Sequence, residues 1–362
     1  MIKLREIKKR NYKKIKHLFL RNKLKITDKI NWINLWKNPI IQKSKNKTLG
    51  YVIENKNKIV GHIGLFPTEY RFKNKKLNCQ VLHGWVIDKA YRNFSISLMN
   101  KFFSKNKSDF YLSTTTNKNA GKIMEALGWK KINIKGLSQT SIIILNEKNF
   151  LRRIFFNKKI LYNEFTIFML GKILGILFKK NLNKWKNYQS DPCIISYNKF
   201  DNKINNFWEK YKRENYSKIL IKKNLQWLNW LLGNYLLKKR AKVFVIQENG
   251  NIYGYCIYIT SKKNKINYAQ ILDIAVLKSH QKKKISLLRK CINEANKNDC
   301  AFFEFRNTYY KNLELLRDFK PININLSNNY FYFKPMIKNN NNIFNFENWH
   351  LSSLDGDIAL NY

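Results

Sequence analysis

The sequence predicts a mixed α/β fold, of the α+β type, in which one folding unit occurs twice. Segments of strand character alternate with segments of helical character along most of the 362 residues. A Trp-rich helical segment precedes a strand–turn–strand pair in each half, with 25 positions from Trp36 to Gly61 and 24 from Trp230 to Gly254. Such a matched interval indicates an internal duplication. The length, which exceeds what one hydrophobic core usually organises, also predicts two domains.

The first half is expected to begin with the Trp-rich helix and to end with a helix that closes at Gly128. Asn31 to Pro39 reads NWINLWKNP, which is helical in character. Tyr51 to Phe66 reads YVIENKNKIVGHIGLF, two strands joined by a polar turn. The elements expected after this pair are a strand at 80–87, an amphipathic helix at 94–103, a strand at 109–115 and a helix at 119–129.

The second half repeats this order of elements. LQWLNWLLGNY, from Leu225 to Tyr235, is the helix, and VFVIQENGNIYGYCIYI is again a strand pair around a polar turn. The elements expected next are a strand at 268–277, a helix at 284–297, a strand at 300–306, a helix at 310–319 and a loop at 339–342. We therefore predict an N-terminal domain at 1–140, a connecting helical segment at 141–200 and a C-terminal domain at 201–362.

The chain is strongly basic, with 70 Lys and Arg residues against 23 Asp and Glu and a formal net charge of +47. A charge of this size suggests a polyanionic partner, either nucleic acid or an anionic membrane. The positive residues are mostly Lys and are scattered along the chain, whereas specific readers of phosphates and bases concentrate Arg. We therefore favour a charge that reflects composition, without a nucleic-acid partner, and keep a functional basic face as the alternative.

The five cysteines show neither C-x-x-C spacing nor His partners at metal-ligand intervals; they are Cys79, Cys193, Cys256, Cys291 and Cys300. They predict no metal site and no disulfide framework, and an unpatterned odd number fits a reducing compartment. The N-terminus, MIKLREIKKRNYKKIKHLFL, lacks the uninterrupted apolar core of a signal peptide. We expect a cytoplasmic protein.

The most apolar segment is FTIFMLGKILGILF, from Phe165 to Phe178. It is interrupted by Lys172 and is shorter than the ~20 apolar residues that span a bilayer. Its flanking lysines are typical of a helix in peripheral contact with an anionic membrane; they are Lys158, Lys159, Lys179 and Lys180. The alternative, which we favour, is a helix between the two domains with one buried stripe.

Three motifs of the first half resemble those of the GNAT N-acetyltransferase superfamily. IVGHIG resembles the family's G-x-x-V-G strand, IDKAYRNFSISL (Ile87 to Leu98) resembles its acyl-CoA loop, and NKNAGKIMEALGW (Asn117 to Trp129) resembles its N-x-x-A helix. The resemblance covers most of residues 1–133 and is weaker across 225–335. It implies two tandem GNAT-like domains, each a mixed, mostly antiparallel central sheet flanked by helices.

The acyl-CoA loop that this resemblance implies is Arg92-Asn93-Phe94-Ser95-Ile96-Ser97. A pyrophosphate needs several N–H donors that point the same way, and the first turn of a helix supplies them. The family has glycine where Ser95 and Ser97 stand, but serine is small and its hydroxyl adds a donor. The resemblance implies acetyl-CoA, or another acyl-CoA, as cosubstrate, and it also assigns Asn117 and Ile87 to cosubstrate binding.

The corresponding loop of the second half departs further from the family's pattern. It reads Gln281-Lys282-Lys283-Lys284-Ile285-Ser286, with Lys284 at the first glycine position. A long side chain there crowds a phosphate away from the backbone, although its ammonium group can instead pair with the phosphate. We therefore expect a degenerate C-terminal domain that shapes the substrate cleft, and catalysis in the first half.

Acyl transfer to an amine needs a base, a stabiliser for the oxyanion and an acid for the leaving thiolate. The resemblance implies that the backbone N–H of Ile87 stabilises the oxyanion. It also places Met124 at the position where the family often has a Tyr that serves as the general acid. His83 is our candidate for the general base, because neutral imidazole accepts a proton near pH 7. A His inside a strand is more often a packed core residue. His62 and Asp88 are candidates for substrate binding.

The C-terminal sequence ENWHLSSLDGDIAL resembles the ending of tandem GNAT-like proteins of bacterial surface-polysaccharide synthesis. Under this resemblance, His350, Asp355 and Asp357 bind the ammonium or hydroxyl groups of an amino sugar. The alternative is that Asp-Gly-Asp is only a turn. A metal site would need more oxygen ligands than these residues offer.

These observations leave three functions open. The first is an acyl-CoA-dependent N-acyltransferase, in particular an N-acetyltransferase, that acts on an amine such as an amino sugar of a cell-surface glycan. The second is an aminoacyl transferase of the peptidoglycan-bridge type, which takes its acyl group from charged transfer RNA. The third is a noncatalytic binding protein, which the missing glycines and tyrosine favour. The recognisable CoA loop leads us to expect the first.

Overall fold

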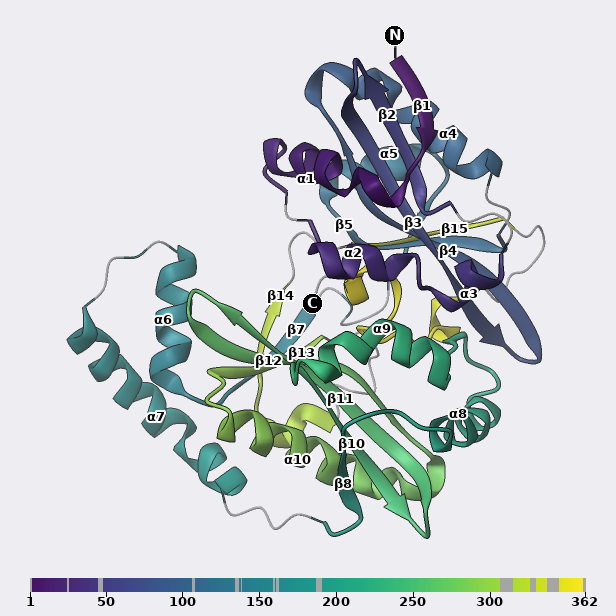
Figure 1. The fold of residues 1–362 in the computed structure, drawn as a ribbon. Helices are drawn as coiled ribbons and strands as arrows, with labels where there is room; N and C mark the ends of the chain where they lie inside the picture. Colours follow the sequence, from purple (N-terminus) through teal and green to yellow (C-terminus); the bar gives the residue numbers. More distant parts are fainter. Residues whose placement is uncertain are drawn as a thin grey trace.

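The computed structural model of the protein describes residues 2–24, 26–44, 48–105, 108–133, 137, 139–158, 160, 163–186, 191–306, 315–325, 330–336 and 345–360. These residues form two mixed β-sheets, each flanked by helices (Figure 1). The expected mixed α/β class is confirmed.

The first sheet contains one parallel strand pair. Its strands are, in spatial order, β1 (Ile2–Glu6), β2 (Gly50–Asn55), β3 (Lys58–Phe72), β4 (Lys75–Ile87), β5 (Phe110–Thr116), β15 (Tyr330–Pro335) and β6 (Lys130–Lys131). β4 and β5 are parallel, and the other neighbours are antiparallel. β9 (Leu220–Ile221) also pairs with the end of β3.

The second sheet has the same plan. Its strands are, in spatial order, β8 (Ile194–Tyr197), β10 (Ala241–Glu248), β11 (Asn251–Lys263), β12 (Ile266–Val276), β13 (Phe302–Arg306), β7 (Gln139–Ile144) and β14 (Ile322–Asn325). β12 and β13 are parallel, and the other neighbours are antiparallel.

Each sheet includes one or more strands from the other half of the chain, and in the first sheet these are β15 and the short strand β9. β7 follows the elements of the first half in sequence but pairs with β13 and β14, whereas β15 pairs with β5 and β6. The strands of each sheet therefore come from more than one of the predicted ranges 1–140, 141–200 and 201–362. The physical reason is that either sheet offers an antiparallel neighbour whose N–H and C=O groups satisfy the exchanged strand, so strand character alone does not say which sheet it joins.

Helices cover both sheets and line the space between them. The α-helices are α1 (Tyr12–Arg21), α2 (Lys29–Leu35), α3 (Pro39–Lys43), α4 (Ser95–Lys105), α5 (Lys118–Ala126), α6 (Glu147–Lys158), α7 (Glu164–Lys186), α8 (Lys203–Glu214), α9 (Leu225–Leu237) and α10 (Lys284–Lys297). The 3₁₀ helices are η1 (Lys9–Asn11), η2 (Lys89–Phe94), η3 (Lys278–Lys283), η4 (Arg317–Phe319), η5 (Phe346–Asn348) and η6 (Gly356–Leu360).

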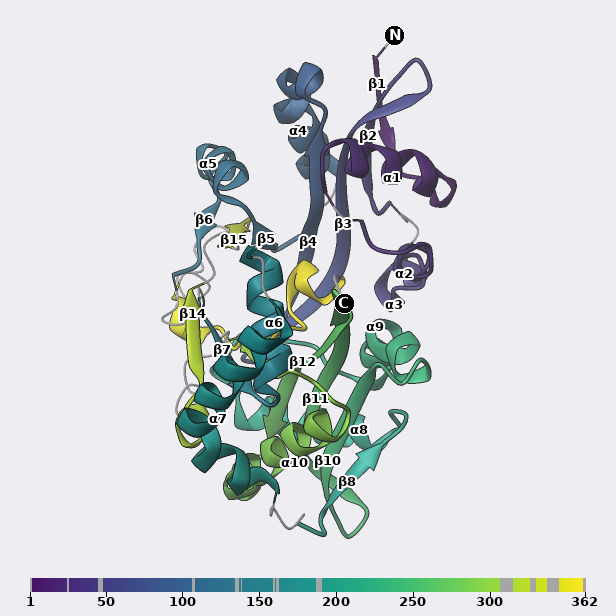
Figure 2. The same cartoon turned by 90° about the vertical axis from the view of Figure 1, so that its left-hand side faces the viewer.

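The two Trp-rich helices, α2 and α9, join the halves (Figures 1 and 2). The amide of Asn34 donates to the backbone oxygen of Trp230 at 2.6 Å, and the indole of Trp230 donates back to the backbone oxygen of Asn34 at 2.8 Å. The amide of Asn31 donates to the hydroxyl of Tyr235. The largest cluster of buried apolar residues also contains members of both halves, including Phe66 and Trp230. The halves therefore share one core.

The structure bears out the expected order of elements where it can be compared. The helix expected at 284–297 is α10, and the strand expected at 80–87 is the second part of β4. The first half of the helix expected at 310–319 and the loop expected at 339–342 lie outside the described residues, and residues 317–319 form η4. The internal repeat thus corresponds to two sheets of one plan.

Candidate functional site

The parallel strands β4 and β5 separate towards their carboxyl ends. They pair only from Cys79 with Phe110 to Val81 with Leu112, whereas β3 and β4 remain paired as far as Ile87. The segment from Leu82 to Ile87 therefore has one edge without a strand neighbour among the described residues. In open α/β sheets, ligands bind outside the carboxyl ends of parallel strands.

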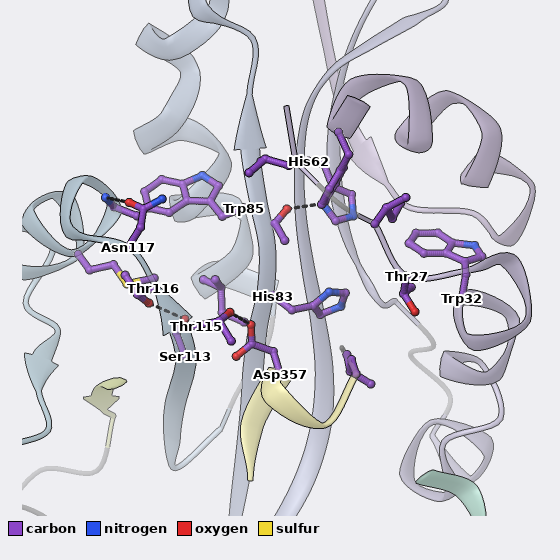
Figure 3. Close-up of a pocket in the computed structure, with 18 residues that line it drawn as sticks. Thr27, Trp32, His62, His83, Trp85, Ser113, Thr115, Thr116, Asn117 and Asp357 are labelled. Atoms are coloured by element: carbon purple, nitrogen blue, oxygen red, sulfur yellow. Dashed lines mark hydrogen bonds between the residues drawn. The ribbon is translucent and has the colours of Figure 1, made fainter. Parts of the chain in front are cut away.

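A cavity of about 220 Å³ lies at this separation. Figure 3 shows Thr27 and Trp32 on one side, hydroxyl side chains of β5 on the other, and His83 and Asp357 between them. The lining polar residues are Thr27, His62, His83, Ser113, Thr115, Thr116, Asn117 and Asp357. The structure thus brings together four of the residues predicted from sequence: His62, His83, Asn117 and Asp357.

The backbone N–H of Ile87 points towards the separation. Asp88 donates its backbone N–H to the oxygen of Val60, so these two residues form a hydrogen-bonded antiparallel pair. The adjacent pair, Gly61 with Ile87, is then a non-hydrogen-bonded pair, in which each N–H points away from the partner strand. The side chain of Ile87 is buried in the core, so only its backbone can serve a ligand.

The predicted acyl-CoA loop forms η2 and the first turn of α4. Its residues Arg92, Asn93, Ile96 and Ser97 are exposed. The hydroxyl of Ser95 donates to the backbone oxygen of Arg92 at 2.6 Å, which links the end of η2 to the start of α4. The loop is accessible to a ligand from solvent, and the N-terminus of α4 provides the favourable end of a helix dipole for an anion.

His62 on β3 has a fixed tautomer. Its Nδ1 lies 2.6 Å from the backbone oxygen of Gly84, and a carbonyl oxygen can only accept, so Nδ1 carries the proton. Its Nε2 is buried and has no hydrogen-bond partner among the described residues. Burial lowers the pKa of His62 to about 4. Neutral His62 therefore keeps an unused lone pair next to the cavity.

His83 on β4 lies beside His62, with 6.2 Å between ring centroids. Burial, together with a smaller effect of the neighbouring His62, lowers the pKa of His83 to about 3. Its Nε2 is also buried without a partner in the described part of the chain. Gly64 makes room for this ring, because a Cβ there would lie 2.4 Å from Cε1 of His83. Both imidazoles are thus neutral at pH 7.

Asp357 reaches the cavity from the end of the chain. Its Oδ1 accepts from the backbone N–H of Thr114 at 2.9 Å and from the Thr114 hydroxyl at 2.6 Å, and its Oδ2 accepts from the hydroxyl of Thr115. Burial raises the pKa of this carboxyl, and the hydrogen bonds oppose that rise. Gly356 has φ of +71°, and a Cβ there would lie 2.3 Å from Thr114. The Asp-Gly-Asp sequence is therefore fitted against β5 and is not only a turn.

The second sheet repeats the separation of its parallel strands. β12 and β13 pair only at Ala269–Phe303 and Gln270–Glu304, while β11 and β12 stay paired as far as Val276. The loop after β12 forms η3 and the start of α10. A cavity of about 480 Å³ lies beside this loop, and its lining includes Lys278, Lys282, Lys284 and His350.

Residues 202–319 match the family model described as Acetyltransferase (GNAT) family. This segment is similar to a GNAT domain. The match lies in the second half, whereas we expected the better agreement in the first. The pattern of strands and core residues in the second half thus carries the family likeness, although its loop has Lys284 at a glycine position. The sequence matches no curated protein significantly.

Solved structures of GNAT-type enzymes are similar to the whole chain. N-myristoyltransferase of Saccharomyces cerevisiae with bound myristoyl-CoA matches with a TM-score of 0.57 and 12% identity, over 92% of this chain and 82% of that one. A GCN5-related N-acetyltransferase from Anabaena variabilis matches with a TM-score of 0.55 and 11% identity, over 92% and 73%. One from Kribbella flavida matches with 0.55 and 8%, over 92% and 72%. The likeness is one of fold and extends over both sheets.

Asp88 lies outside the cavity between β4 and β5. Its carboxylate accepts from the guanidinium of Arg21 at 2.6 Å and 2.9 Å and from the amide of Asn22 at 2.8 Å. Burial raises the pKa of Asp88, but these hydrogen bonds outweigh it and hold the pKa below its usual value. The carboxylate connects α1 to the end of β4 and is already occupied, so the structure does not support the expected contact with substrate.

Asp355 and His350 also lie away from the first cavity. Asp355 is fully buried and accepts from the hydroxyl of Tyr70 at 2.8 Å and from the backbone and hydroxyl of Ser352 at 2.7 Å and 2.9 Å. It thus ties the C-terminal segment to β3. His350 lines the second cavity, where its Nδ1 lies 3.3 Å from the hydroxyl of Tyr211. The three C-terminal candidates therefore belong to three different environments.

The sequence analysis missed the hydroxyl cluster of β5. Ser113 and Thr116 share a hydrogen bond of 2.8 Å, and the hydroxyl of Thr116 contacts the sulfur of Met124 at 3.6 Å. A run of hydroxyl residues at the carboxyl end of a parallel strand was the available signal. Met124 lines the cavity, as expected for the position of the family's tyrosine. In the described residues, no group of three His, Cys, Asp or Glu side chains is placed to hold a metal ion.

Proposed function

We propose that the protein is an acyl-CoA-dependent N-acyltransferase whose reaction takes place in the cavity between β4 and β5. One observation carries the proposal: the unpaired edge of β4 presents the N–H of Ile87 next to an accessible loop at Arg92–Ser97. A strand edge can hold an extended pantetheine-like chain by backbone hydrogen bonds, and a helix N-terminus can hold the diphosphate. The similarity to a structure with bound myristoyl-CoA supports this arrangement.

The chemistry follows from the cavity. The acceptor nitrogen attacks the thioester carbonyl, the N–C bond forms, and the N–H of Ile87 stabilises the oxygen that becomes negative. The proton of the amine goes to Nε2 of His83, which has no partner among the described residues. The pKa of this imidazole is lowered to about 3, so the transfer requires the negative charge that develops on the substrate to raise it. The C–S bond then breaks, and the proton held by His83 passes to the thiolate through water near the hydroxyls of Ser113 and Thr116, which returns His83 to its neutral form.

Asp357 is the proposed contact of the acceptor. Its carboxylate is the acidic group that lines the cavity within the described residues, and it can attract an ammonium group before the amine loses its proton. Hydroxyl groups beside it, on Thr115 and Thr27, can bind a polyol. These features support an amino sugar as acceptor, for example one of a cell-surface glycan. We propose an acetyl group as the acyl group that is transferred. The free cysteines support a reducing, cytoplasmic location.

Thermal unfolding with and without ligand tests cosubstrate binding. Acetyl-CoA, butyryl-CoA and myristoyl-CoA at about a hundred times Kd should stabilise the folded protein by about 2.7 kcal/mol and raise Tm by several degrees. Ser97→Phe should abolish this rise, because the ring blocks the approach of a diphosphate to the first turn of α4. Ser104→Phe is the matched control, since Ser104 is exposed near the other end of the same helix.

The outcome separates the proposed function from its alternatives. A rise that survives in Ser97→Phe would show that the diphosphate lies elsewhere. Absence of any shift with all three acyl-CoA compounds, together with binding of charged transfer RNA that weakens steeply with salt, would favour the aminoacyl transferase. Binding of acyl-CoA without turnover of any amine would favour the noncatalytic protein.

A further inference from the structure

The outer face of α7 is apolar and exposed. This face consists of Phe165, Met169, Ile173 and Ile176, which follow one another at the spacing of a single helical stripe. Their exposed fractions are 70%, 44%, 52% and 74%. Phe156 at the end of α6 is also exposed. No described part of the chain covers these side chains.

The opposite face of α7 is already used for packing. Ile167 is 1% exposed, Gly171 is buried and Leu174 is partly buried, and α7 packs against α6 and α10. Figures 1 and 2 place α7 on the outer side of the second half, away from the first sheet. The interpretation that we favoured from sequence was a helix between the domains with one buried stripe. The buried stripe is present, but α7 packs on the second half and does not lie between the two sheets. The halves meet through α2 and α9. A surface helix such as α7, which packs against the protein on one side only, is expected to have a polar outer face.

The surroundings of the outer face are basic. The ammonium groups of Lys148 and Lys172 lie 4.7 Å and 4.5 Å from the ring centre of Phe168, which borders the outer face. From Glu147 to Lys186 the sequence contains eight Lys and two Arg against two Glu. Glu164 is paired with Arg152 at 2.5 Å. An apolar stripe bordered by cations is attracted to a surface that combines anionic headgroups with a hydrocarbon interior.

We propose that α7 docks the protein on an anionic membrane surface, with its outer face among the acyl chains and with Lys148 and Lys172 at the headgroups. The contact is peripheral, because no described helix is long and apolar enough to cross a bilayer. A second copy of this chain fits less well, since its own face would bring the same positive charges together. The formal charge of +47 favours an anionic partner over a neutral or basic one. This proposal is independent of the acyltransfer reaction.

Co-sedimentation of the full-length protein with lipid vesicles tests the proposal. We expect binding to vesicles of phosphatidylcholine and phosphatidylglycerol, with much weaker binding to phosphatidylcholine alone and a decrease in high salt. The double variant Phe165→Ser/Ile176→Ser should reduce the partition coefficient about tenfold or more, because two large apolar side chains no longer enter the bilayer. The control is Leu20→Ser/Leu237→Ser, which removes two exposed apolar side chains from α1 and α9 and should bind as the unmodified protein does.

Two results would overturn the proposal. One is equal binding of the two double variants, which would mean that the lysines hold the protein on the vesicles at some other face. The other is a concentration-dependent dimer in light scattering that Phe165→Ser/Ile176→Ser abolishes, which would assign the face to a second copy. Because both altered side chains are exposed, the variants should retain the Tm of the unmodified protein, and this is checked before the vesicle experiment.

Discussion

The two separated strand pairs use equivalent positions in different ways. In the first, the imidazole of His62 donates to the backbone oxygen of Gly84 and leaves its Nε2 without a partner among the described residues. In the second, the hydroxyl of Tyr255 donates to Asp273 at 2.6 Å, and the ammonium group of Lys223 pairs with the same carboxylate oxygen at 2.8 Å. The first strand pair thus has the Nε2 of His62, unpaired within the described part of the chain, beside a cavity. In the second, Lys223, Tyr255 and Asp273 form a buried cluster in which the carboxylate is paired.

The equivalence follows from the strand register. Gly61 pairs with Ile87 in the first sheet, and Gly254 pairs with Val276 in the second. His62 directly follows Gly61, and Tyr255 directly follows Gly254. On the neighbouring strands, Gly84 lies three residues before Ile87, and Asp273 lies three residues before Val276. The strand pairing is thus similar, although Gly84 has a φ of +58° and the register shifts at a different position in each sheet. The chemistry depends on whether the polar side chains form hydrogen bonds with one another. A buried group that is fully paired stabilises the fold, whereas an unpaired one is retained at a cost that a function can explain.

The largest expected difference between the two regions is in catalysis. His83→Ala should lower kcat by about 10² to 10⁴, because it removes the proposed base. Its effect on Tm should be small, since the ring borders a cavity and already has an unpaired nitrogen. Tyr255→Phe, in the second region, should leave kcat unchanged. A loss of kcat below tenfold in His83→Ala, measured by thiol release from acyl-CoA, would exclude His83 as the base.

A smaller effect is expected on stability, and it should lie in the second region. Asp273→Ala leaves the ammonium group of Lys223 buried without its partner, and breaking such a pair costs about 3–5 kcal/mol. Urea unfolding measures the loss. The double variant Lys223→Met/Asp273→Ala should recover most of it, because no ammonium group is then left buried without the Asp273 carboxylate. A single-variant loss below about 1 kcal/mol would mean that water reaches the ammonium group.

The sequence allowed the repeated order of elements and four of the residues that line the first cavity to be predicted. The matched intervals found both sheets, and the motif at Arg92–Ser97 identified a loop that is accessible beside the strand separation. His62, His83 and Asn117 line one cavity, and they belong to, or lie close to, motifs that the sequence resemblance had singled out. Their roles in binding or catalysis stay predictions. Local patterns could find these features because each depends on neighbours in sequence.

Features that depend on distant segments could not be predicted in this way. The exchange of β7 and β15 depends on which of two similar sheet edges a strand meets. Asp357 reaches the cavity while Asp355, two residues earlier, binds Tyr70 on β3, and no local pattern distinguishes these two carboxylates. Asp88 looked like a ligand for an amine because its partner, Arg21, lies far away in sequence.

The smallest expected difference concerns pH. Burial lowers the pKa of His62 to about 4, against about 6.5 in an unfolded chain. Below about pH 6.5 the unfolded chain therefore binds a proton at His62 that the folded protein does not bind. The free energy of unfolding consequently decreases as the pH falls from about 6.5 towards 4. Between pH 7 and pH 5 the loss from this residue amounts to about 2 kcal/mol. His83 contributes in the same direction, because its pKa is lowered to about 3.

Replacing His62 by phenylalanine isolates this contribution. The new ring fits an aromatic environment, since Phe19 and Trp32 already contact the imidazole at centroid distances of 5.4 Å and 6.3 Å. His62→Phe should lose about 2 kcal/mol less than the unmodified protein between pH 7 and pH 5 in urea unfolding, while Tyr255→Phe should show the pH dependence of the unmodified protein. Equal pH dependence in all three proteins would mean that His62 gains a proton inside the folded state, so that its Nε2 is not held as a bare lone pair beside the cavity.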